Sequence, residues 1–122
     1  MRHVILVLAL ALVGCVHAAA IATESAAIAS LACDGGSTHT ALESSRYIET
    51  NPVMGERPDP SVQAAYFGGA GAAVVGINEL LAHGLDPTAG DVWRIIANVA
   101  IIGVEVDAVY GNSSIGVPVC GI

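Results

Sequence analysis

Four apolar stretches follow one another along the chain and are separated by short polar segments. They cover residues 4–13, 18–32, 61–83 and 92–110. The second and third have Glu24 and Glu79 as their only formal charges, whereas polar residues such as Arg94 recur along the fourth. The last two stretches are about 20 residues long, enough for a helix to cross a hydrocarbon layer of about 30 Å. The pattern predicts helices rather than strands.

Turn-forming residues mark the ends of these helices. Asp59-Pro60 and Asp86-Pro87 each place a capping carboxylate before a proline, whose missing N–H is harmless at the first helical position. The two helices after these pairs are joined by a short connector, so they form an antiparallel hairpin. We expect a signal segment over 1–18 and one helical domain over 19–122, consisting of helix 19–47, loop 48–60, helix 61–83, helix 87–110 and tail 111–122.

Composition favours a membrane protein. Charged residues make up 12% of the 122 residues and the mean hydropathy is +0.68, whereas soluble domains carry about 25% charge. A net charge of −7 with only four Lys and Arg residues excludes an electrostatic nucleic-acid binder. The predicted fold class is therefore all-α: a signal segment followed by a small membrane bundle of about three helices, whose last two form a transmembrane hairpin. The predicted location is the bacterial cell envelope, at the inner membrane.

The amino terminus has the order of a secretory signal, with Arg2 before an apolar run and small residues after it. Three outcomes stay open. The run from Leu12 to Cys15 resembles a bacterial lipobox, which makes Cys15 the candidate lipidation site. The triplet Val16-His17-Ala18 suits ordinary signal peptidase instead. Alternatively nothing is cut, and residues 4–21 are retained as a membrane anchor.

Small residues recur along one face of the predicted helix 61–83. Gly68, Ala72 and Gly76 are spaced by four residues, and such a stripe lets helix backbones approach closely in lipid. We expect this stripe and the polar stripe of the next helix to face each other, because intramembrane polar groups avoid lipid. An ion pair between Arg94 and Glu79 fits this packing.

Two polar motifs precede the helix 61–83, the first within the predicted helix 19–47 and the second in the loop 48–60. Asp34 to Thr38 reads D-x-x-S-T, and Glu49 to Gly55 reads E-x-N-P-x-M-G. Together they resemble a group of small, uncharacterised bacterial membrane proteins that carry D-x-x-[ST]-T and E-x-N-P-x-[ML]-G motifs. The resemblance implies a three-helix membrane protein in which Asp34, Thr38, Glu49 and Asn51 matter, and it implies no activity.

Local chemistry suggests how the two motifs are shaped. Asn51-Pro52 initiates a turn, and Gly55 permits a positive φ. This loop is either structural or a site for a partner. Gly35-Gly36, inside the first motif, predicts a kink in the first helix.

The cysteines bear on topology. If helix 19–47 crosses the membrane from outside, the loop containing Arg46 and Arg57 lies in the cytoplasm, in line with the positive-inside rule. Cys33 and Cys120 then stay reduced. If this helix lies along the outer surface instead, both cysteines face an oxidising compartment and can pair.

No catalytic, metal or cofactor site is predicted. His39 and Glu43 lie one helical turn apart, but a metal site needs three or four ligands, so we interpret them as a solvated pair. The predicted function is a non-enzymatic structural or accessory membrane subunit, with lipid and either its own copies or a larger membrane complex as partners. The alternatives are a lipid-anchored envelope protein that binds through the E-x-N-P loop, and a phage-type membrane-permeabilising protein.

Overall fold

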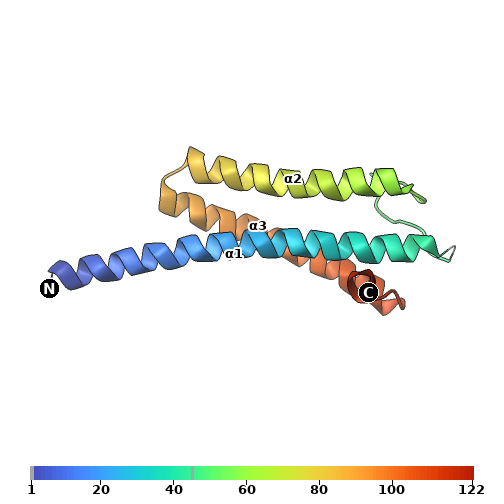
Figure 1. Cartoon of the computed structure of the whole chain (residues 1–122), viewed down its shortest axis with the longest axis horizontal. Coiled ribbons are helices and arrows are strands. Elements are labelled where there is room, and N and C mark those ends of the chain that lie inside the picture. Colours follow the sequence, from blue (N-terminus) through green and yellow to red (C-terminus); the bar gives the residue numbers. More distant parts are fainter. Residues whose placement is uncertain (1, 45) are drawn as a thin grey trace.

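The computed structural model describes residues 2–44 and 46–122, which form three long helices and one short 3₁₀ helix (Figure 1). Within these residues there is no strand, so the all-α prediction is confirmed. The elements are α1 (Arg2–Glu43), α2 (Pro60–Gly84), α3 (Pro87–Ser114) and η1 (Val119–Gly121). α2 and α3 run antiparallel, and α1 lies along both of them, with its most extensive contact against α3.

α1 is a single helix of 42 residues rather than two separate segments. The signal segment and the helix predicted over 19–47 are continuous, and the kink expected at Gly35-Gly36 is wrong. The helix continues through both glycines, which let neighbouring groups approach closely: a Cβ on Gly35 would lie 3.1 Å from the Phe67 ring, and one on Gly36 would collide with the carbonyl oxygen of Cys120. The amino-terminal part of α1 projects beyond the other helices (Figure 1).

The starts of α2 and α3 follow from their capping residues. Asp59 accepts hydrogen bonds from the backbone N–H groups of Ser61 and Val62, and Asp86 accepts from Thr88 and Ala89 in the same way. In both cases proline occupies the first turn, where the helix needs no donor. The helices end at Gly84 and Ser114, so α3 is one turn longer than its apolar pattern suggested.

Both polar and apolar side chains are buried in the bundle, where Ala27, Leu31 and Val74 form a small apolar core, and many large apolar side chains lie on its outside. The largest fully buried side chains are Asn78, Asn98 and Ser37. Exposed apolar residues include Leu12, Ile21, Leu80, Ile96 and Val104. The buried residues with polar or charged side chains are Ser37, Thr38, Gln63, Asn78, Asp91, Arg94 and Asn98. Buried polar groups together with a largely apolar exterior are the arrangement expected of helices that pack in lipid.

The packing face of α2 differs from the predicted one. Gly68, Ala72 and Gly76 are exposed, and no neighbouring atom lies within 4 Å of where a Cβ would stand on either glycine. The inward face carries Val74, 4% exposed, and Asn78, 1% exposed. Val74 packs against Ala27 and Leu31, and Asn78 pairs with Asn98 of α3, so the opposite face with the small-residue stripe is left on the outer surface.

A disulfide joins Cys33 of α1 to Cys120 of η1 across 87 residues of sequence. Disulfides form and persist in oxidising compartments. The structure therefore contradicts the expectation that both cysteines stay reduced. Pairing is the outcome expected if the first helix lies along the outer surface, and α1 itself packs along α3 within the bundle.

Two helices in the described part of the chain are long and apolar enough to cross a membrane. They are the segment Ala11–Glu43 of α1 and the whole of α2, with mean hydropathies of 1.5 and 1.2. The hairpin of α2 and α3 is present as predicted. However, α3 does not meet this criterion of length and hydropathy, whereas α1 and α2 do. α3 carries the charged residues Asp91, Arg94, Glu105 and Asp107 along its length.

Candidate functional site

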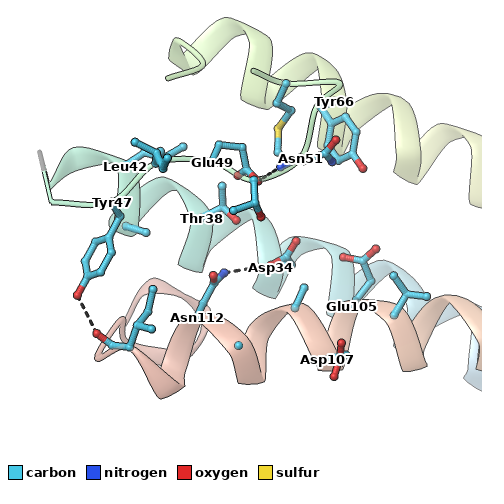
Figure 2. Close-up of a pocket in the computed structure, with 18 residues that line it drawn as sticks. Asp34, Thr38, Leu42, Tyr47, Glu49, Asn51, Tyr66, Glu105, Asp107 and Asn112 are labelled. Atoms are coloured by element: carbon cyan, nitrogen blue, oxygen red, sulfur yellow. Dashed lines mark hydrogen bonds between the residues drawn. The ribbon is translucent and has the colours of Figure 1, made fainter. Parts of the chain in front are cut away.

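A pocket of about 470 Å³ lies at the end of the bundle where α1 meets the loop before α2 (Figure 2). Both sequence motifs line it. Asp34 and Thr38 come from α1, Glu49 and Asn51 come from the loop, and Glu105 comes from α3. A volume of this size suits a small molecule. The structure thus brings together four residues that the sequence had placed in two separate motifs.

The loop motif forms a compact turn whose hydrogen bonds stay largely within the motif. The Asn51 backbone N–H donates to Glu49 Oε1 at 2.7 Å, and the Val53 N–H donates to Asn51 Oδ1 at 3.0 Å. The N–H groups of Met54 and Gly55 both donate to the Asn51 carbonyl. Gly55 has a φ of 80°, which favours glycine. Met54, 8% exposed, anchors the turn in the pocket wall.

Pro52 follows Asn51 in this turn and is exposed. Its fixed φ favours the turn conformation, and it contributes no side chain to the pocket lining. Pro52 and Gly55 therefore shape the loop, whereas Glu49 and Asn51 face the cavity.

The α1 motif is held by a contact with α3. The Asn112 side-chain amide donates to Ser37 Oγ at 3.0 Å and makes a longer contact of 3.4 Å with Asp34 Oδ1. Ser37 also donates to the Asp34 carbonyl at 3.0 Å. Thr38 is 6% exposed, and within the described residues its hydroxyl has no hydrogen-bond partner. Its position on the lining leaves that hydroxyl facing the pocket (Figure 2).

The remaining polar lining comes from residues that the motifs do not include. Glu105 and Asp107 lie on α3, Tyr66 lies on α2, and Tyr47 donates from its hydroxyl to the carbonyl of Ile115 at 2.7 Å. A sequence signal existed only for Glu105, as part of the polar stripe on the fourth apolar stretch. The two tyrosines gave no signal, because a tyrosine near a helix end is equally typical of a membrane interface.

The pocket is acidic. The carboxylates of Asp34, Glu49 and Glu105 lie around it, whereas the Asp107 side chain points away from them (Figure 2), and none of its described lining residues is Lys, Arg or His. Asp34 experiences the like charges of both Glu49 and Glu105. An anionic cavity of this kind attracts cations and repels anions.

A second polar cluster, deeper in the bundle, is centred on Arg94. Its guanidinium donates to Asp91 Oδ1 and to Glu24 Oε2, each at 2.9 Å, and to Asn78 Oδ1 at 3.3 Å. The side chain is 9% exposed. His17 lies 3.0 Å from the other oxygen of Asp91. The cluster therefore ties α1, α2 and α3 together at one level.

The predicted ion pair between Arg94 and Glu79 is wrong. Glu79 lies on the outer face of α2 and pairs instead with His83, at 3.1 Å. Arg94 finds its carboxylates on α1 and on its own helix. Beside it, the amides of Asn78 and Asn98 donate to each other at 2.9 Å in both directions.

His39 and Glu43 lie 3.5 Å apart on α1, and the second ring nitrogen of His39 contacts Gln63. In the part of the chain that the structure describes, no group of three or more His, Cys, Asp or Glu side chains is placed to hold a metal ion. Comparisons with known protein families, curated proteins and solved structures find no match to this chain.

Proposed function

We propose that this chain is a small, non-enzymatic integral membrane protein of the bacterial envelope that binds a ligand through its acidic pocket. The observation that carries this proposal is the convergence of both motifs on one cavity. Asp34 and Thr38 reach it from a helix and Glu49 and Asn51 from a loop, about a dozen residues further along the chain. Packing alone does not require four polar side chains around a space of about 470 Å³.

Residence in the membrane is supported by the buried polar groups and by the large apolar side chains on the outside of the bundle. A buried Arg94 with two carboxylate partners is expensive in lipid unless it faces the bundle interior, as it does here. α2, at 25 residues, is about 38 Å long, enough to cross the hydrocarbon layer with some tilt.

The proposed orientation places the pocket outside the cytoplasm. The disulfide between Cys33 and Cys120 lies at the pocket end, and disulfides persist in oxidising compartments. In α1, the stretch from Ala11 to Cys33 is about 33 Å long, a full span before the pocket begins. Of the three outcomes for the amino terminus, retention as an anchor agrees with this orientation, and the intact mass of the purified protein tests it.

The binding function is tested by native mass spectrometry of protein purified from membranes in mild detergent. Ala108 lines the pocket, so Ala108→Phe fills it, whereas Ala100→Phe adds the same bulk on an exposed site of the same helix. We expect a bound small molecule in the wild type and in Ala100→Phe that is lost in Ala108→Phe. Identical spectra from all three proteins contradict the proposal.

A second candidate, an accessory subunit of a larger assembly, is favoured by the exposed stripe on α2. Gly68 and Gly76 present an open backbone surface to the surroundings, where another helix can approach. Gly68→Leu and Gly76→Leu are then expected to weaken association in a membrane two-hybrid assay. Val106→Leu, at an exposed position of α3, serves as the control. Equal effects of all three changes on association exclude this candidate.

A further inference from the structure

The polar groups around the pocket define the chemistry of what it binds. We propose that the ligand is a small organic cation carrying two or more separated ammonium groups, such as an aliphatic polyamine. This inference rests on the proposed binding function and adds the class of ligand to it. The groups that select the cation are the carboxylates of Asp34, Glu49 and Glu105 together with the hydroxyl of Thr38.

Two of the groups have no partner within the described bundle. Glu105 is half-buried and its carboxylate makes no hydrogen bond or ion pair to any described residue. Thr38 is more than nine-tenths buried, and its hydroxyl is likewise unpaired and faces the cavity (Figure 2). Among the described residues no fully buried side-chain nitrogen or oxygen lacks a partner, so these two unpaired groups are open to the cavity, where a ligand can reach them. An ammonium group has three N–H donors and fits both acceptors.

The arrangement of the carboxylates favours an extended cation over a single metal ion. They approach the pocket from α1, the loop and α3, and the described residues contain no cluster of three ligands close enough to hold a metal. Several anionic groups spread around about 470 Å³ match charges that are spaced along a chain. The ring of Tyr66, also on the lining, offers an aromatic face of the kind to which cations bind.

The test measures binding of spermidine and of 1,4-diaminobutane to the purified full-length protein by isothermal titration calorimetry, with magnesium chloride as the comparison. We expect saturable binding of the two amines and none of comparable affinity for Mg²⁺. Glu105→Gln and Thr38→Val are expected to weaken the amine affinity, by about tenfold and severalfold respectively. Both replaced groups lack partners in the bundle, so the variants are expected to unfold at the wild-type temperature.

Glu79→Gln is the matched control, because it removes one negative charge from an exposed site away from the pocket. If it weakens binding as much as Glu105→Gln does, or if Mg²⁺ binds as tightly as the amines, the inference is overturned. Absence of saturable amine binding also overturns it. If native mass spectrometry finds a neutral or anionic molecule that Ala108→Phe removes, the binding function stands and the cationic ligand is refuted. If it finds no molecule, the binding function itself fails.

Discussion

Replacing Arg94 by methionine removes the group that joins all three long helices, while keeping most of the apolar stem. The guanidinium makes two charge-assisted hydrogen bonds of 2.9 Å, to Asp91 and Glu24, and a third to Asn78 at 3.3 Å. Without it, two carboxylates are left in the interior with no cation between them. Breaking a buried ion pair by removing one partner costs about 3–5 kcal/mol.

This loss is large compared with the whole stability of a domain, which is about 5–15 kcal/mol. We therefore expect Arg94→Met to lower the free energy of unfolding by about 3–5 kcal/mol. The assay is denaturant or thermal unfolding in mild detergent, followed by far-UV circular dichroism. Arg46→Met, on an exposed loop residue, is the control and is expected to change the unfolding free energy by less than about 0.5 kcal/mol.

A compensated variant separates loss of the ion pair from loss of packing. Adding Glu24→Gln and Asp91→Asn to Arg94→Met removes the stranded charges, and replacing a complete buried network is often close to neutral. The triple variant is therefore expected to recover most of the lost stability. If Arg94→Met unfolds like Arg46→Met, the cluster does not hold the helices together and the reasoning is refuted.

Three further changes have expected outcomes. Cys33→Ser removes the disulfide between residues 87 positions apart, so it should lower the free energy of unfolding by about 2–4 kcal/mol. The wild type should migrate differently on reducing and non-reducing gels, and the variant should not. Equal mobility of the wild type under both conditions refutes the pairing. Gly36→Ala places a Cβ against the Cys120 carbonyl, so we expect thermal unfolding to show a free energy of unfolding lowered by about 1–3 kcal/mol. Gly68→Ala, where the Cβ enters open space, is the control and should show no such loss. The Ser61 hydroxyl, followed by the backbone N–H groups of Val62 and Ser61, donates to Asp59 and holds the pKa of its carboxyl below the usual value. The contribution of Asp59 to stability is therefore full above about pH 4 and is lost as the pH falls through the lowered pKa. Asp59→Asn should flatten this acid dependence of the unfolding temperature, and an unchanged slope contradicts the reasoning.

The helix starts were predictable because they depend on neighbours in sequence. Asp59 and Asp86 stand directly before prolines and cap α2 and α3 as expected. The partner of Arg94 was not predictable, because Glu24 lies 70 residues away and the register between helices is set by packing. The sequence spacing suggested Glu79, which points outward.

The pocket was predictable in part. Asp34, Thr38, Glu49 and Asn51 were singled out as two motifs, but their convergence depends on how the loop folds back on α1, which no local pattern encodes. The packing face of α2 was misjudged for a physical reason: in a bundle with a polar interior, small residues on a helix do not identify the inward side. Val74 lies inside because it packs against Ala27 and Leu31 of α1.

The most direct test of the account is the accessibility of the two ends of the bundle in intact cells. In a Cys15→Ser background, single cysteines are introduced at Val53 in the pocket loop and at Leu85 in the α2–α3 connector, both exposed positions. A membrane-impermeant maleimide is then applied before and after permeabilisation. We predict that Val53→Cys reacts in intact cells and that Leu85→Cys reacts only after permeabilisation. The reverse pattern, or equal labelling at both ends, contradicts a membrane-spanning bundle with its pocket facing outward.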